Sequence, residues 1–151
     1  MAAIIDYQDK YQQDFRRLNL EWLEQYNLVE SHDLEILDHP RENVIERGGF
    51  IFLLKEDDAI IGTAGLFKVN DEEYELIKMF VLPQYRGKKF GDMLLQQCIN
   101  KAKEAKASKI ILYSNSRLQT AIRLYEKYNF KHVAVTDAPF VTADVKMELI
   151  L

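Results

Sequence analysis

The sequence predicts a single α/β domain over residues 1–151, in which helices flank a mixed and mostly antiparallel sheet. Between residues 50 and 82, three strand-like segments follow one another across tight turns, which is typical of an antiparallel meander. A helical pattern then separates the third segment from a buried strand at residues 109–113, and such strand–helix–strand units join parallel strands. Two further strand-like segments close the chain, so the predicted sheet is mixed.

Composition and charge limit the classes of function that this protein can have. The chain has 151 residues, of which 48% are hydrophobic and 29% charged, as expected for a globular protein with one core. Its net charge of −4 argues against general nucleic-acid binding, which needs a basic face. No apolar run is long enough to span a membrane, and the N-terminus lacks the pattern of a signal peptide. Cys98 is the only cysteine, so no internal disulfide can form. These features predict a cytoplasmic protein.

The first 47 residues are predicted to hold a short edge strand at residues 2–6 and then mainly helix. Residues 7–26 carry a helical stripe of apolar and aromatic side chains, namely Tyr11, Phe15, Leu18, Trp22 and Tyr26. We expect this stripe to be mainly core. Ser31, His32 and Asp33 resemble a helix cap before the next apolar segment. His32 and His39 flank that segment with a spacing that suits no common metal site, so no metal is expected.

The segment that organises the rest of the chain is residues 74–91. Its apolar run, residues 76–82, predicts a buried strand that Pro83 ends. The turn that follows contains Gly87 and Gly91 and leads into a helical pattern. Amides at a helix N-terminus have no partner within the helix, and the helix dipole favours negative charge there. The turn is therefore predicted to bind a pyrophosphate, with glycines that allow close approach.

Basic side chains in the same turn agree with this prediction. Arg86, Lys88 and Lys89 add positive charge, although a solvated basic turn is the alternative interpretation. The helix that follows is predicted to bury Cys98 as an unreactive thiol, because no positive partner is adjacent. A second helix is predicted at about residues 117–128, and Asn129 fits the left-handed position that ends it.

Two segments together resemble the GNAT superfamily of acyl-CoA N-acyltransferases. The first, ELIKMFVLPQYRGKKFG, contains RGKKFG where the family usually has R-G-x-G-x-G, so Lys89 replaces the middle glycine. The second, TAIRLYEKYNFKHV, contains YEKYNF where the family has Y-E-K-x-G-F, so Asn129 replaces glycine. Leu118 stands where the family usually has asparagine, and Asn115 is a candidate substitute for its contact with the pantetheine arm.

The resemblance implies an enzyme that transfers an acetyl group from acetyl-CoA directly to a primary amine of a small molecule or peptide. It also implies that the sheet opens after the central strand, where the pantetheine arm lies like an added strand. The residues then expected to contact the cofactor are Met79, Phe80, Val81, Arg86, Gly87, Lys88, Lys89, Phe90, Gly91, Asn115 and Tyr125. Among them, the amide of Val81 is expected to face the thioester oxygen as an oxyanion donor.

Two proton transfers define the catalytic candidates. An alkylammonium with a pKa of ~10 must lose a proton before it attacks, and a thiolate with a pKa of ~8.5 benefits from gaining one. The two-residue period of a strand predicts one face that carries Glu73, Glu75, Ile77, Met79 and Val81. Glu75 is the preferred base and Glu73 the reserve, because Glu75 matches the family's acidic position. Tyr125 is the candidate acid. A solvated carboxylate and a core aromatic are the alternative interpretations.

The resemblance places the amine acceptor among the first two helical segments, the central strand and the loop around Pro139. The candidate acceptor residues are Trp22, Tyr26, His32 and Phe140. We expect no nucleic-acid or membrane partner, and either a monomer or a homodimer. Two other functions stay open. One is a catalytically weak acyl-CoA-binding sensor or scaffold of the same fold, which the substitutions at Lys89 and Leu118 favour. The other is an unrelated phosphate-binding enzyme such as a kinase, although no G-x-x-x-x-G-K-[S/T] segment is present.

Overall fold

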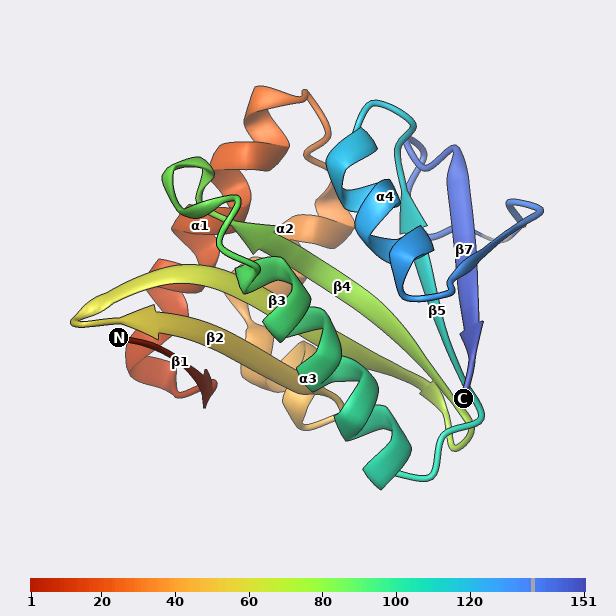
Figure 1. Ribbon diagram of the computed structural model, residues 1–151, viewed down its shortest axis with the longest axis horizontal. Coiled ribbons are helices and arrows are strands. Elements are labelled where there is room, and N and C mark those ends of the chain that lie inside the picture. The colour runs from red at the N-terminus through yellow and green to blue at the C-terminus, as the bar shows by residue number, and fades with distance from the viewer. Residues whose placement is uncertain (137) are drawn as a thin grey trace.

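The computed structural model describes residues 1–136 and 138–151, which form a seven-stranded open sheet with helices on both faces (Figure 1). The strands are β1 (Ala2–Asp6), β2 (Phe50–Glu56), β3 (Ala59–Asn70), β4 (Glu73–Val81), β5 (Lys109–Ser114), β6 (Lys131–Val133) and β7 (Val145–Ile150). Their order in the sheet is β1-β2-β3-β4-β5-β7-β6. The pair β4–β5 is parallel, whereas the other recorded pairs are antiparallel. The predicted mixed and mostly antiparallel sheet is confirmed.

The helices are α1 (Gln12–Gln25), α2 (Ser31–Asp38), α3 (Phe90–Glu104) and α4 (Gln119–Lys127), with short helical turns at Asp9–Tyr11, Arg41–Ile45 and Pro83–Tyr85. α1 and α2 cover one face of the sheet, and α3 and α4 cover the other (Figure 1). Each face has its own apolar core, and Cys98 is fully buried in the core under α3, as predicted. No helix among the described residues is long and apolar enough to cross a bilayer.

The N-terminal helices begin at positions that differ from the prediction. α1 starts at Gln12 rather than near Tyr7, because the amide of Tyr7 donates to the carbonyl of Ile51 at 3.0 Å and keeps the chain beside β2. α2 is preceded by Glu30, whose amide donates to the Asp33 carboxylate at 2.9 Å. Ser31 is therefore the first helical residue and not the cap.

A bulge interrupts β4 at Lys78 and changes which side chains share a face. Thr63 of β3 pairs with Phe80 and Gly65 pairs with Ile77, so one residue of β3 opposes two of β4. Lys78 has a φ of 52°, a left-handed conformation that marks the extra residue. The alternation of side chains is consequently reversed beyond this point.

The predicted common face of Glu73, Glu75, Ile77, Met79 and Val81 is therefore wrong. Ile77 and Phe80 belong to the core under α1 and α2, and Glu75, two residues before Ile77, points to the same face. Met79 and Val81 instead contact the core under α3 and α4.

The sheet opens between β4 and β5. Their pairing runs from Glu73 with Lys109 to Leu76 with Leu112 and stops there. Beyond this point β5 stays with β7 and β4 stays with β3, so the two parallel strands diverge toward their carboxyl ends (Figure 1). Open α/β sheets bind ligands in such crevices, outside the carboxyl ends of their parallel strands.

Candidate active site

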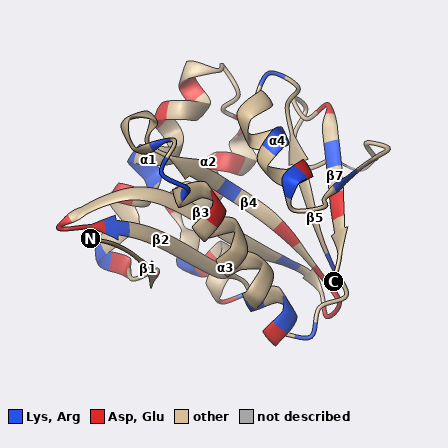
Figure 2. Ribbon diagram, in the orientation of Figure 1, with Lys and Arg blue, Asp and Glu red and all other residues tan. Residues whose placement is uncertain are grey.

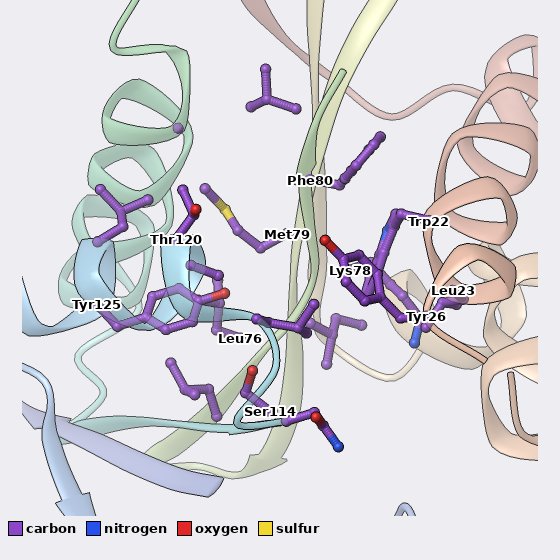
Figure 3. Close-up of a pocket in the computed structure, with 18 of the residues that line it drawn as sticks. Trp22, Leu23, Tyr26, Leu76, Lys78, Met79, Phe80, Ser114, Thr120 and Tyr125 are labelled. Atoms are coloured by element: carbon purple, nitrogen blue, oxygen red, sulfur yellow. The ribbon is translucent and has the colours of Figure 1, made fainter. Parts of the chain in front are cut away.

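A cavity of about 530 Å³ lies where β4 and β5 diverge, and residues from both faces of the sheet line it (Figure 3). Its α3–α4 side is formed by α3, α4 and residues 83–91, and its α1–α2 side by α1, α2 and Phe140. The predicted site residues that line it are Trp22, Tyr26, Glu75, Met79, Phe80, Val81, Arg86, Gly87, Lys89, Phe90, Gly91, Asn115, Tyr125 and Phe140. The structure thus brings together side chains that the prediction took from distant segments, but Lys88 and His32 are not among the lining residues.

The turn between β4 and α3 lines the cavity at the N-terminus of α3. Gly87 has a φ of 81° and Lys89 a φ of 63°. Lys89 therefore adopts a left-handed backbone conformation that is easier for glycine than for lysine. No side chain among the described residues caps the first turn of α3. Gly91 lines the cavity and is also close to α4, because a Cβ there would lie 3.2 Å from Leu124. Its missing side chain lets α3 pack closely on α4.

Basic side chains gather in this turn, which is the blue loop beside the N-terminus of α3 in Figure 2. The Nε of Arg86 donates to the carbonyl of Val81 at 3.3 Å, and its guanidinium lies 5.6 Å from the centroid of the Phe80 ring. The Nζ of Lys88 lies 5.5 Å from the centroid of the Tyr85 ring. Arg86 thus lines the cavity just beyond the end of β4, whereas Lys88 is not among the lining residues.

Glu75 is a buried carboxyl group at the cavity wall, with 8% of its surface exposed. Its pKa is raised from 4.5 to about 7, chiefly by burial and also by the nearby charge of Glu73, while the charges of Lys78 and Lys146 oppose this shift. A carboxyl group with a pKa near neutrality can accept and release a proton at physiological pH. Glu75 therefore has the ionisation that a general base needs.

Tyr125 contributes to the core and to the cavity at the same time. It is 6% exposed, its ring centroid lies 5.9 Å from that of Phe130, and its hydroxyl points toward β4 (Figure 3). Burial raises the pKa of its hydroxyl. The group thus stays protonated at neutral pH, as a proton donor must.

A buried ion pair on the α1–α2 side of the cavity was not predicted. The Nζ of Lys78 donates a hydrogen bond to the carboxylate of Asp33, and both residues line the cavity. Their side chains are only 5% and 3% exposed, respectively. The one signal in the sequence is a lysine within the apolar run of residues 76–82, but its partner lies 45 residues away.

A buried chain of polar groups connects the cavity wall to the bulge. The indole Nε1 of Trp22 donates to the Oδ1 of Asn19 at 3.1 Å. The Nδ2 of Asn19 lies 3.1 Å from the hydroxyl of Thr63, which donates to the carbonyl of Lys78 at 2.7 Å. Asn19 and Thr63 are both fully buried. This chain fixes the indole ring and the bulged backbone relative to each other.

The segment around Phe140 closes the α1–α2 side and is fastened to α2. The Phe140 ring centroid lies 5.0 Å from that of His32 and 5.1 Å from the Nζ of Lys78. The carboxylate of Glu30 accepts from the amides of Val141 and Thr142 at 2.8 and 2.9 Å. His32 thus supports the ring of Phe140 from behind instead of lining the cavity.

Asn115 lines the cavity with its side chain already engaged. Its Nδ2 donates to the carbonyl of Thr142 at 2.8 Å, and its Oδ1 accepts from the amide of Arg117 at 3.0 Å. It therefore joins the turn after β5 to the segment that carries Phe140. Within the described residues, no group of three or more His, Cys, Asp or Glu side chains is arranged to hold a metal ion.

Comparison with known proteins relates this chain to acetyltransferases. Residues 10–130 match the model of the acetyltransferase (GNAT) family. An uncharacterized N-acetyltransferase of Mycobacterium tuberculosis is 30% identical over 105 residues, which are 70% of this chain and 63% of the relative. The uncharacterized N-acetyltransferase YjgM of Escherichia coli is 27% identical over 100 residues, which are 64% of this chain and 60% of the relative. The matches thus span less than two thirds of these relatives.

Solved structures share the fold over the whole chain. An acetyltransferase of the GNAT family from Staphylococcus aureus has a TM-score of 0.92 and 24% identity, and the match covers 99% of both chains. The PaiA N-acetyltransferase of Thermoplasma acidophilum, solved with coenzyme A, has a TM-score of 0.76 and 18% identity, with 100% of this chain and 99% of that chain covered. The family model matches most of the sequence, and the fold agrees with it. The chain belongs to the acetyltransferase (GNAT) family.

Proposed function

We propose that this protein is an enzyme that transfers an acetyl group from acetyl-CoA directly to a primary amine of a small molecule or peptide. The observation that carries the proposal is one continuous cavity that joins the turn before α3 to Glu75 across the open edge of β4. Two proteins of the same fold were solved with CoA or acetyl-CoA, namely PaiA from Thermoplasma acidophilum and YncA from Salmonella typhimurium.

In this proposal the α3–α4 side of the cavity receives acetyl-CoA. The pyrophosphate meets the backbone amides of residues 87–91 and the guanidinium of Arg86, because a helix N-terminus favours negative charge. The pantetheine arm lies along the edge of β4 that β5 leaves unpaired. The amide of Val81 donates to the thioester oxygen, where negative charge develops during attack. Lys88, placed outside the cavity, contributes through its charge alone.

The chemistry needs one base and one acid. Glu75 takes a proton from the ammonium group of the acceptor, directly or through a water molecule, and the neutral amine attacks the thioester carbon. A C–N bond forms, the C–S bond breaks, and the hydroxyl of Tyr125 donates a proton to the leaving sulfur. The new amide nitrogen loses its second proton, which restores the hydroxyl of Tyr125, and Glu75 releases its proton to solvent. Glu75 is close to half ionised at neutral pH, because its pKa is about 7. It can therefore act as this base without a large change in its pKa when the substrate binds.

The test is release of free thiol from acetyl-CoA in the presence of a panel of amines, with the acetylated product identified by mass spectrometry. The panel contains aromatic and aliphatic monoamines, amino acids, polyamines, aminoglycosides and peptides. Amine-dependent thiol release with a matching N-acetylated product supports the proposal. Tight binding of acetyl-CoA without product from any of these amines contradicts it and favours the sensor or scaffold function.

A further inference from the structure

The α1–α2 side of the cavity presents mostly aromatic and aliphatic surface. The side chains that form this wall are Trp22, Leu23, Tyr26, Leu28, Phe80 and Phe140. The rings of Trp22 and Phe80 lie nearly parallel, with their centroids 6.0 Å apart and an angle of 20° between their planes. Figure 3 shows both rings on the side of β4 that faces α1. A flat apolar group packs well against an aromatic wall of this kind.

The indole nitrogen of this wall is already occupied within the protein. The indole N–H of Trp22 donates to Asn19, which is fully buried and also contacts Thr63. Trp22 therefore offers a ligand the surface of its ring and not a hydrogen-bond donor. Because Asn19 is itself held by the carbonyl of Phe15 at 2.9 Å, the ring is fixed before any ligand arrives.

Three charged side chains from α2 and β4 line this side, namely Asp33, Glu75 and Lys78. Asp33 and Lys78 form an ion pair with each other deep in the wall. Glu75 makes no hydrogen bond or ion pair with another side chain among the residues that the structure describes. Arg86 also lines the cavity: it donates to the carbonyl of Val81, and its guanidinium lies 5.6 Å from the centroid of the Phe80 ring, but the proposed function assigns this charge to the pyrophosphate. One carboxyl group is thus left to meet a charge on the acceptor.

This balance of charge discriminates between classes of amine. A polyamine or an aminoglycoside brings several cations into the site, where only Glu75 is left to pair with them. An amino acid brings a carboxylate to a wall on which Lys78 is already neutralised by Asp33, while Arg86 is assigned to the pyrophosphate of acetyl-CoA. Burying a charge without a partner is costly in both cases. A compound with one ammonium group and no carboxylate meets Glu75 and leaves no charge unpaired.

We infer that the acceptor is a primary amine that carries one positive charge and no carboxylate and is attached to a flat apolar body. This inference rests on the proposed acyl transfer and names the substrate class of the same site. The amine lies at Glu75, and the apolar body packs on Trp22 and Phe80.

The test compares three amines at saturating acetyl-CoA, with thiol release as the readout. 2-Phenylethylamine has one amine and a flat body, phenylalanine adds a carboxylate to the same body, and spermidine adds cations without the body. We expect kcat/KM for 2-phenylethylamine to exceed both others by about tenfold or more, since unpaired buried charges strongly reject a substrate. An equal or higher kcat/KM for phenylalanine or spermidine overturns the substrate class and leaves acyl transfer standing. No thiol release with any amine of the wider panel overturns acyl transfer itself, and this inference with it.

A pair of variants tests the wall. Trp22→Ala should raise KM for 2-phenylethylamine by about tenfold, because it removes the aromatic surface on which the body packs. Trp22→Phe keeps a ring and should restore most of the loss. The affinity for acetyl-CoA, measured by calorimetry, should stay the same in both variants, which also shows that they are folded. An unchanged KM in Trp22→Ala would remove the aromatic wall from the recognition of the acceptor.

Discussion

Glu75 combines burial with access to the cavity, and this combination gives it the properties of a base. Its neighbours are two lysines, Lys78 and Lys146, which favour the carboxylate, and Glu73, which disfavours it. Burial is the largest influence and raises the pKa to about 7. A carboxyl group in water would be almost fully ionised at neutral pH, but it would be a weaker base.

The pH dependence of the rate tests this assignment. Because the base must be ionised, the wild-type kcat/KM should rise with pH through an apparent pKa of about 7 and level off above it. Glu75→Gln is nearly isosteric and cannot accept the proton, so only amine that is already neutral reacts. Its rate should be low at neutral pH and recover partly toward the free-amine pKa of ~10.

Glu73→Gln is the matched control for this profile. The charge of Glu73 raises the pKa of Glu75, so its removal should move the acidic limb to lower pH and leave the plateau rate unchanged. Glu73 itself contacts Lys109 at 3.2 Å at the start of β4. A Glu75→Gln profile parallel to that of wild type would show that another group takes the proton. Recovery at high pH in Glu73→Gln instead would transfer the role to Glu73.

Tyr125 is tested by removing its hydroxyl alone. Tyr125→Phe keeps the ring that packs on Phe130, so the fold and the affinity for CoA should persist. If the hydroxyl protonates the leaving thiolate, kcat should fall by about 10- to 1000-fold. The measurement is single-turnover kinetics, so that the chemical step is observed directly. An unchanged single-turnover rate would leave Tyr125 with a packing role only.

At the scale of elements, the bulge in β4 determines the layout of the cavity. It directs Phe80 and the side chain of Lys78 toward α1 and α2 while Met79 and Val81 face α3 and α4. The hydroxyl of Thr63 supports it by donating to the carbonyl of Lys78. The same hydroxyl contacts Asn19, which orients Trp22. One buried threonine thus couples the backbone of β4 to the wall formed by α1.

Thr63→Val should therefore affect both stability and the acceptor site. It keeps the shape of the side chain but removes a hydrogen bond from the buried amide of Asn19 and from the carbonyl of Lys78, which should cost about 1–3 kcal/mol of unfolding free energy. KM for the amine should rise while the affinity for acetyl-CoA stays unchanged. Thr63→Ser retains the hydroxyl and should keep KM near the wild-type value. If Thr63→Val loses stability but keeps KM, the network is structural only.

The turn before α3 is tested by matched reversals of charge. Arg86→Glu places a negative charge where the pyrophosphate is proposed to bind, and the dissociation constant of CoA should rise by about tenfold or more, as for the loss of a charged hydrogen bond. Lys88→Glu makes the same change in net charge outside the cavity and should have a smaller effect. Calorimetric titration with CoA measures both. Equal affinities in Arg86→Glu and wild type would contradict the proposed pyrophosphate site.

The elements that could be predicted from sequence are those with local signals. The meander from β2 to β4 and the crossover through α3 follow from alternating apolar runs and from turns marked by glycine, proline and asparagine. The bulge at Lys78 could not be predicted this way, because it depends on the register between β3 and β4. The pairing of Lys78 with Asp33 depends in turn on how α2 docks on the bulged strand. Glu75, Tyr125 and Trp22 were proposed as site residues through the family resemblance, while the stacking of Trp22 on Phe80 needed the tertiary structure.

At the scale of the whole molecule, the sheet separates two cores, and the cavity is the place where they meet. Phe80 belongs to the core under α1 and α2, and Val81 to the core under α3 and α4, although they are neighbours in β4. Functional groups at this junction are surrounded by apolar packing from both faces. Ionising Glu75 in this apolar environment is unfavourable, so its proposed role as a base lowers the free energy of unfolding.

This loss of stability should appear in the pH dependence of unfolding. The pKa of Glu75 is raised from 4.5 to about 7 in the folded protein, so folding favours the protonated carboxyl group. The stability of the folded protein should therefore decrease as pH rises from the unfolded-state pKa of 4.5 through the folded-state pKa of about 7. By linkage, a pKa difference of this size corresponds to about 3 kcal/mol of unfolding free energy. Glu75→Gln stays neutral and does not suffer this loss.

Urea unfolding of wild type and Glu75→Gln between pH 5 and pH 8 measures the effect, since contributions from all other groups cancel in the difference to first order. The free energy of unfolding of Glu75→Gln should rise relative to that of wild type as pH rises, by up to about 3 kcal/mol, and the difference should become constant about one pH unit above the folded-state pKa of about 7. Glu75→Gln, although slow in catalysis at neutral pH, should therefore have a greater stability relative to wild type at neutral pH than at pH 5. Parallel stability curves would show that Glu75 is solvated in the folded protein, and would remove the physical basis for its role as the base.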